Sequence, residues 1–197
     1  MPIFRYVLLA LSLLLVACQQ PVPHYSAQQW EAQRPKVEAL TQWSLNGKLA
    51  IVTAQKKGSL RLFWQQNGDD YRLNLSTVLG TRVLELSRQG NRIRLIDEDG
   101  KEHVSNDPAL LIYRLTGWLL PIDELPTWIK GLPGAAQYGL SQNGQLAWVQ
   151  DNQWQLSYQE FASQATGQGE LWLPTRLDLK GPDSRLKLLI NQWNLQP

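Results

Sequence analysis

Residues 43–51 run Trp43-Ser44-Leu45-Asn46-Gly47-Lys48-Leu49-Ala50-Ile51, and apolar side chains in this stretch alternate with polar or small ones. A period of two is the pattern of a β-strand that buries one face. Outward from this stretch the same alternation returns in residues 60–65, 71–76, 84–86, 93–95, 146–148, 154–159, 171–179 and 186–190. The sequence therefore predicts a protein made mainly of short β-strands.

Glycine-containing breaks separate several of these segments. Asn67-Gly68, Gln89-Gly90-Asn91 and Asp99-Gly100 supply the positive φ that a tight hairpin turn needs. Short strands joined by such turns predict an antiparallel barrel or sandwich. Pro174 interrupts a later strand, which indicates an edge or a bend there.

A helix is expected before the first strand. Ser26 and Gln29 have the spacing of a capping box, so the helix should begin at Ser26. Trp30, Val37 and Leu40 can form its apolar face, and Pro35 should kink or divide it.

A helical insert is expected in the middle of the chain. Asp107 can cap a helix that has Pro108 at its first position and Gly117 at its end. A second short segment, residues 122–130, carries apolar residues at helical spacing. The predicted order is helix, strands, helical insert, strands.

The N-terminal residues have the features of an export signal. Arg5 is followed by an apolar run of about a dozen residues, too short for the roughly 20 that span a bilayer. Leu15-Val16-Ala17-Cys18 resembles the lipobox of bacterial lipoproteins, and Cys18 is the only cysteine. The resemblance implies a signal peptide of residues 1–17, cleavage before Cys18 and lipidation of that cysteine. An ordinary signal peptide with a chance cysteine is the alternative.

The remaining chain has the size of one domain. Residues 18–25 contain two prolines and no apolar periodicity, so they are expected to form a lipidated tether before a domain of residues 26–197. Without Arg5 the 19 basic residues become 18, against 17 acidic ones. This balance does not suggest a nucleic-acid partner, which would favour a basic stripe.

The residue patterns of common catalytic and metal sites are missing. His24 and His103 are far apart, so with one lipidated cysteine they predict no metal site. No Gly-x-Ser-x-Gly elbow or phosphate-binding glycine loop occurs. The acidic turn of residues 97–99 is either a solvated hairpin tip or a weak cation site. We expect no cofactor, no catalytic residue and no enzymatic activity.

Nine tryptophans stand beside three phenylalanines. Large rings can fill a protein core. They can also line a cavity that binds an apolar ligand, and a barrel of this size can do either. The helical insert could then close such a cavity as a lid.

Several segments, in order, resemble the outer-membrane lipoprotein receptor LolB family. They are residues 43–50, Phe63-Trp64-Gln65-Gln66, residues 71–75, Leu79-Gly80, Leu115-Thr116-Gly117, Leu120-Pro121, Leu125, Trp128-Ile129, residues 131–134, Leu186-Lys187-Leu188 and Trp193. The resemblance implies a mainly β fold, a half-open antiparallel β-barrel whose mouth is closed by helices.

The same resemblance implies a function. The family accepts lipoproteins from the periplasmic carrier LolA and places them in the inner leaflet of the outer membrane, without using a nucleotide. We therefore expect a lipid-anchored outer-membrane protein that faces the periplasm, a monomer whose partners are LolA and client lipoproteins. Position 19, directly after the lipidated cysteine, is glutamine and not the aspartate associated with inner-membrane retention, which agrees with an outer-membrane location.

One loop can be carried over from the family. Its Pro-Leu-Gly loop has a protruding leucine that acts in membrane delivery, and Leu79-Gly80 match it here. Val78 stands where proline is usual, so the loop should be less rigid. From the residues alone, an ordinary apolar residue at a strand end is the alternative for Leu79.

The expected mechanism is passive transfer of acyl chains down an affinity gradient. The candidate lining residues of the cavity are Leu45, Leu49, Leu62, Trp64, Leu73, Leu75 and Trp148, with Trp118 and Trp128 on the lid. A strand phase wrong by one residue would exchange the faces. Two other classes stay open: a structural or assembly-factor lipoprotein that binds a protein partner through an aromatic surface, and a lipid-modifying hydrolase.

Overall fold

The computed structural model describes residues 27–53, 57–118, 120–167 and 169–195. The predicted signal peptide, Cys18, the tether of residues 18–25 and Ser26 lie outside these residues.

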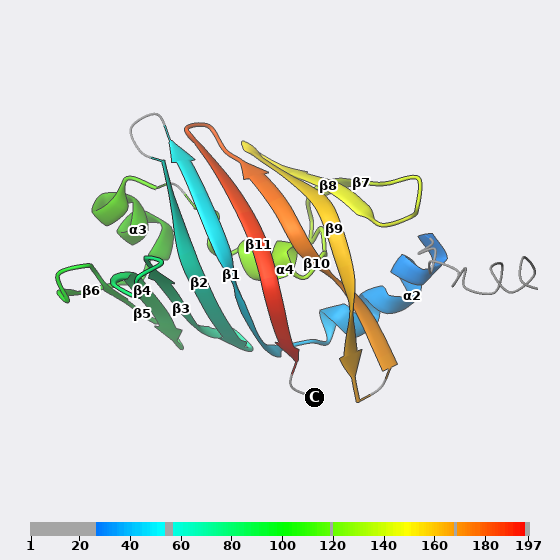
Figure 1. Cartoon of the computed structure of the whole chain (residues 1–197), viewed down its shortest axis with the longest axis horizontal. Coiled ribbons are helices and arrows are strands. Elements are labelled where there is room, and N and C mark those ends of the chain that lie inside the picture. Colours follow the sequence, from blue (N-terminus) through cyan, green and yellow to red (C-terminus); the bar gives the residue numbers. More distant parts are fainter. Residues whose placement is uncertain (1–26, 54–56, 119, 168, 196–197) are drawn as a thin grey trace, which may run out of the picture.

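The described residues form one antiparallel sheet, which is open at both edges (Figure 1). Its strands are β1 Gln42–Thr53, β2 Lys57–Asn67, β3 Asp70–Ser76, β4 Arg82–Gln89, β5 Arg92–Ile96, β6 Glu102–Ser105, β7 Gln137–Leu140, β8 Leu146–Asp151, β9 Trp154–Thr166, β10 Gly169–Lys180 and β11 Ser184–Leu195. The order across the sheet is β6-β5-β4-β3-β2-β1-β11-β10-β9-β8-β7. The first and last strands thus pair at the centre and join two runs of hairpins.

Alternating burial confirms the predicted strand pattern. Every second residue of β1, from Trp43 to Gly47, is buried, and the residues between them are more exposed. The turn glycines Gly68, Gly90 and Gly100 all have positive φ, as the predicted hairpins require. Pro174 does not mark an edge, because β10 lies between β9 and β11, but the β9–β10 register is irregular beside it, as an interruption of the strand predicts.

Gly47 permits the central pairing of β1 with β11. The register between the two strands shifts at Asn46/Gly47, and a Cβ at Gly47 would lie 2.5 Å from the carbonyl oxygen of Leu189. A side chain at this position would therefore force the two strands apart.

Three helices accompany the sheet in the described residues: α2 Ala27–Glu38, α3 Pro108–Thr116 and α4 Leu125–Ile129. The structure has α3 as predicted, because the Asp107 side chain accepts a hydrogen bond from the backbone N–H of Leu110, and Gly117 ends the helix with a φ of 73°. Helix α2 runs through Pro35 without being divided.

Helix α2 packs against the β10 side of the sheet. Trp30 and Val37 are buried, as expected for its apolar face, whereas Leu40 lies beyond the end of the helix and is half-buried against the core. The Gln33 side chain donates to the Trp172 carbonyl at 3.1 Å and accepts from the Trp172 N–H at 2.9 Å. These two bonds fix the helix to the backbone of β10.

The segment of residues 107–134 joins β6 to β7, the two edges of the sheet, and is called the lid below. Figure 1 shows its helix α4 behind the central strands and α3 beside β5 and β6. The buried apolar side chains of the sheet, the lid and α2 form one continuous cluster. The predicted half-open barrel with a helical lid is confirmed.

Candidate functional site

An apolar cavity lies between the inner face of the sheet and the lid. Its wall consists of Leu49, Leu62, Trp64, Leu73, Leu75, Leu84, Leu86, Ile112, Trp118, Leu120, Ile122, Leu125, Trp128, Ile129, Leu156, Leu177, Leu179, Leu186 and Leu188. Every one of these side chains is leucine, isoleucine or tryptophan. Such a wall can favour an apolar ligand by burial but offers no side-chain hydrogen bonds for recognising a polar one.

Seven of the nine residues expected to line the cavity lie in its wall: Leu49, Leu62, Trp64, Leu73, Leu75, Trp118 and Trp128. Leu45 is fully buried but does not belong to the wall. Its cross-strand neighbours are Trp64 and Trp193, and the ring of Trp193 packs on Trp43 at a centroid distance of 5.4 Å. Aromatic rings fill the barrel at this level, so Leu45 faces packed core.

The prediction that Trp148 lines the cavity is wrong, because its side chain is 40% exposed. On β8, Leu146 pairs with Leu140 and Trp148 pairs with Gly139, so Ala147 is an extra residue without a partner. A bulge of this kind reverses the alternation of faces. The indole covers Gly139 on the outer side, where a Cβ would lie 2.4 Å from its Nε1.

The sequence prediction missed twelve wall residues. They are Leu84, Leu86, Ile112, Leu120, Ile122, Leu125, Ile129, Leu156, Leu177, Leu179, Leu186 and Leu188. Those on strands carry the same period-two signal as the residues that were chosen. The signal marks an inner face, but only the closure of the barrel decides which part of that face borders the cavity.

The tryptophans serve both of the roles considered for them. Trp64, Trp118 and Trp128 line the cavity, whereas Trp43 and Trp193 are core. The buried indoles of Trp64 and Trp193 donate their N–H groups to Gln66 Oε1 at 2.9 Å and to the Pro174 carbonyl at 2.9 Å. These bonds let large amphipathic rings pack inside without leaving a donor unsatisfied.

The free space in the cavity is small, about 60 Å³. A single water needs roughly 10–15 Å³ by the same measure, so there is room for only a few groups of methylene size. A long acyl chain does not fit between these side chains as they stand. Loading such a chain requires the lid or the strands to move outward.

A buried hydrogen bond fastens the lid to the opposite wall. The Tyr158 hydroxyl on β9 donates to the carbonyl of Trp128 in α4 at 2.7 Å. Burial raises the pKa of Tyr158 well above its ordinary value of 10, so the hydroxyl stays protonated and able to donate. The bond opposes outward movement of α4.

Lys130 ties the end of α4 to the end of α2. Its ammonium donates to the carbonyl of Val37 in the last turn of α2 at 3.2 Å and to that of Leu40, just after the helix, at 2.9 Å. Burial lowers the pKa of Lys130, and the nearby Glu38 carboxylate partly opposes this. Gly131 follows, with a φ of +83°, and a Cβ at this position would lie only 3.2 Å from atoms of Phe161 and Pro174. The lid is therefore held firmly at this end.

The turn between β3 and β4 projects apolar side chains into solvent. Leu79 is 94% exposed and Val78 is 65% exposed. The turn is closed by hydrogen bonds from the Thr77 N–H to the Thr81 carbonyl and from the Gly80 N–H to the Thr77 carbonyl, and Gly80 has a φ of 90°. Leu79 thus lies at the tip of a well-defined hairpin turn although valine replaces proline before it.

The acidic turn of residues 97–99 is organised by internal contacts. His103 Nε2 lies 2.7 Å from Asp97 Oδ2, and the same carboxylate accepts the backbone N–H groups of Asp99 and Lys101. The histidine contact, followed by the backbone bonds, holds the pKa of Asp97 below its ordinary value. Among the described residues, no group of three histidine, cysteine or acidic side chains is placed to hold a metal ion.

None of the helices in the described part of the chain is both long and apolar enough to cross a membrane.

The sequence matches known proteins over most of its length. The family model "Outer membrane lipoprotein LolB" matches residues 41–193. A protein named outer-membrane lipoprotein LolB from Aeromonas salmonicida is 49% identical, with 93% of this chain and 92% of that protein covered. One of the same name from Serratia proteamaculans is 37% identical over the whole of both chains.

Solved structures with little sequence identity share the fold. A LolA superfamily protein from Nitrosomonas europaea has a TM-score of 0.52 at 10% identity, with 87% of this chain and 94% of that chain covered. A DUF1329 family protein from Desulfovibrio piger has a TM-score of 0.51 at 7% identity, with 86% and 92% covered.

Proposed function

The chain belongs to the LolB family and is an outer-membrane receptor for lipoproteins, and we propose that its apolar cavity receives the acyl chains of a client. The observation that carries this proposal is the composition of the cavity wall, which is entirely aliphatic and aromatic. Each methylene that leaves water contributes about 0.8 kcal/mol, so a wall of this kind is sufficient to hold an acyl chain.

Transfer into the cavity needs no nucleotide in this proposal. A carrier cavity and this one remove similar apolar area from water, so a small difference in affinity sets the direction. About 1.4 kcal/mol gives a tenfold preference. The bilayer then accepts the chains because it buries them more completely. The closed lid has to open at both steps, since the resting cavity is too small for a chain.

The open side of the barrel is the proposed docking place of the periplasmic carrier LolA. Apart from the Leu79 turn, the large apolar side chains exposed among the described residues lie in two groups near opposite edges of the sheet (Figure 1): Val104 on β6 with Leu110, Tyr113 and Leu115 on α3, and Tyr138 and Leu140 on β7 with Trp148 on β8. We place the docking surface on the first group, because exposed apolar side chains that are neighbours favour a protein interface and α3 is part of the lid. A carrier held here would face the lid directly.

The Leu79 turn is the proposed contact with the membrane during release. A leucine moved from water into lipid gains roughly 1.5–3 kcal/mol. The turn lies at the end of a hairpin and contributes nothing to the cavity wall. Release and acceptance therefore depend on different residues and can be separated by substitution.

Reconstituted transfer tests the proposal. LolA loaded with a labelled lipoprotein is mixed with this protein and liposomes, and the label is followed from carrier to receptor to vesicle. We expect stoichiometric acceptance without liposomes and vesicle incorporation when they are present. Tyr113→Glu should slow acceptance, whereas Gln42→Glu, on the outer face of β1, should not. Acceptance that is equally fast in both variants contradicts docking at the open side.

A further inference from the structure

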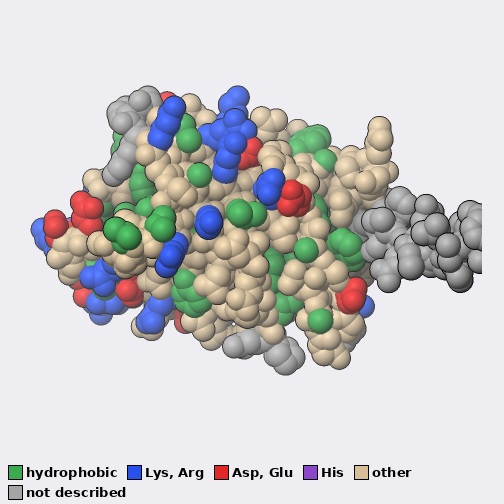
Figure 2. All heavy atoms as spheres, in the orientation of Figure 1, with side chains coloured by type: hydrophobic (Ala, Val, Ile, Leu, Met, Phe, Trp, Pro, Cys, Tyr) green, Lys and Arg blue, Asp and Glu red, His purple; other side chains and the backbone are tan. Residues whose placement is uncertain are grey.

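The outer face of the four central strands carries a group of lysine and arginine side chains. The group is called the cationic face and consists of exposed Lys48 on β1, Lys57 and Arg61 on β2, Lys180 on β10 and Lys187 on β11. Figure 2 shows basic side chains spread over this face, which Figure 1 presents toward the viewer. The proposed functions of the cavity and the Leu79 turn use none of these residues.

These cations lack carboxylate partners. Within the described residues, none of the five forms an ion pair within 4 Å. Lys48 lies directly opposite Arg61 across β1 and β2, and Lys180 lies opposite Arg185 across β10 and β11. Like charges in such positions destabilise a sheet. Asp178 relieves the second pair through its contact with Arg185 and also lies opposite Lys187 across β10 and β11, whereas on the described strands the first pair has no acidic residue opposite it.

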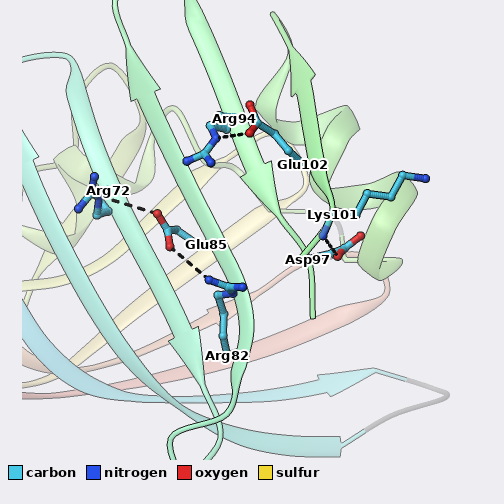
Figure 3. Close-up of polar contacts among 7 residues, drawn as sticks. All are labelled: Arg72, Arg82, Glu85, Arg94, Asp97, Lys101 and Glu102. Carbon is cyan, nitrogen blue, oxygen red and sulfur yellow. Dashed lines mark hydrogen bonds and ion pairs between the residues drawn. The ribbon is translucent and has the colours of Figure 1, made fainter. Parts of the chain in front are cut away.

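The neighbouring strands show the opposite arrangement. Figure 3 shows Arg72 and Arg82 on either side of Glu85, and Arg94 against Glu102. Arg92 also lies within ion-pair distance of Glu102. Each of the five arginines on β3–β6 thus lies within ion-pair distance of a carboxylate, Arg88 through Asp123, whereas in the part of the chain that the structure describes the five cations of the cationic face do not.

The cationic face occupies the half of the central strands nearer to the Leu79 turn. The turns β1–β2, β3–β4 and β10–β11 lie at the same end of an antiparallel sheet, and Lys57, Lys180 and Lys187 lie at or near that end. Toward the opposite end the outward residues of β1, β2 and β11 carry no charge: they are Gln42, Ser44, Asn46, Phe63, Gln65, Asn67, Gln192 and Asn194. On the other side of Leu79 the turn of residues 97–99 is acidic, so the positive potential is confined to the central strands.

We propose that the cationic face binds the anionic headgroups of a phospholipid leaflet. Basic side chains near an anionic bilayer are attracted to it without any shape requirement. A protein partner would favour apolar or aromatic anchors, and no large apolar side chain exposed among the described residues lies on these four strands. The cationic face would contact the surface of the leaflet while the Leu79 turn enters it. The repulsion between Lys48 and Arg61 is then relieved on the membrane.

Vesicle binding tests the proposal without any client, so its failure is separate from failure of the cavity's function. The buried apolar residues described lie between Trp30 and Trp193, so a chain that starts after Cys18 keeps the described core. The test variant is K48Q/R61Q/K187Q. The control is R72Q/R92Q/R94Q, which removes equal charge from cations that have carboxylate partners.

The unsubstituted chain should bind phosphatidylcholine vesicles that contain phosphatidylglycerol, bind pure phosphatidylcholine more weakly, and dissociate as salt is raised. The test variant should lose about 100-fold in partition coefficient, roughly fivefold per cation. It should unfold no more readily than the unsubstituted chain, because like charges have been removed. The control should lose much less. Equal losses in the two variants, or no preference for phosphatidylglycerol, overturn the proposal. So does a test variant that keeps vesicle binding and loses binding to LolA, which would assign the face to an acidic protein.

Discussion

Replacing Tyr158 by phenylalanine should loosen the lid. The substitution keeps the ring and removes the hydroxyl that donates to the Trp128 carbonyl at 2.7 Å. The Trp128 carbonyl keeps the bond that it accepts from the Gly131 N–H at 3.0 Å, so the loss is that of one buried hydrogen bond, about 0.5–1.5 kcal/mol. The substitution should lower the stability of the closed state by that amount. It should leave the stability of an open state unchanged, because the bond is already broken there.

The expected functional effect follows from the same quantity. If the open fraction limits uptake, the apparent affinity for an acyl chain rises in proportion to that fraction. A loss near 1.4 kcal/mol corresponds to a tenfold gain. Titration with a fluorescent fatty-acid probe measures the affinity, and urea unfolding measures the stability. We expect Tyr158→Phe to be less stable and to bind the probe more tightly.

Tyr71→Phe is the matched control. Tyr71 is also a buried inward-facing tyrosine, but its hydroxyl has no hydrogen-bond partner among the described residues. Removing this hydroxyl sacrifices no bond and lifts a desolvation cost, so stability should be unchanged or higher and probe affinity unchanged. The reasoning is refuted if Tyr158→Phe matches Tyr71→Phe in stability, or if it loses stability with no gain in affinity.

Two further substitutions separate the delivery loop from the fold. Leu79→Glu should leave acceptance of a labelled lipoprotein intact and impair its release into liposomes, because the carboxylate loses the roughly 1.5–3 kcal/mol that a leucine side chain gains in lipid. Leu79→Met keeps the apolar character and should transfer normally. Normal release by Leu79→Glu would contradict a role of the loop in delivery. Gly47→Ala should lower the free energy of unfolding by about 1–3 kcal/mol in a urea titration, since its Cβ meets the Leu189 carbonyl at 2.5 Å. Gly58→Ala on β2 meets nothing within 4 Å and should change little, so equal effects would argue against a tight β1–β11 contact.

Local chemistry made much of the fold predictable from the sequence. The alternation around Trp43 set the inner and outer faces of β1, and Gly68, Gly90 and Gly100 marked hairpins that the structure contains. The cap and end of α3 followed from Asp107, Pro108 and Gly117. Each of these signals depends on residues close in sequence, and such signals survive folding unless tertiary contacts oppose them.

The errors came from features that depend on distant residues. Trp148 changed face because of one unpaired residue, Ala147, and a bulge has no dependable sequence signature. Leu45 was a sound choice for the inner face, but rings contributed by β2 and β11 fill the space in front of it. The cationic face was hidden in a nearly balanced net charge, because only the strand register places Lys48 opposite Arg61.

The most direct test of the central claim is to map where an acyl chain sits. A triacylated lipopeptide with a photoreactive group at the end of one acyl chain is bound to the protein and irradiated, and the attached residues are identified by mass spectrometry. Attachment to wall residues such as Trp64, Trp118 and Leu188, with none at exposed Trp148, is the predicted result. Attachment confined to Trp148 and the outer face, with the cavity wall unmodified, would contradict the proposal that the cavity holds the client's lipid.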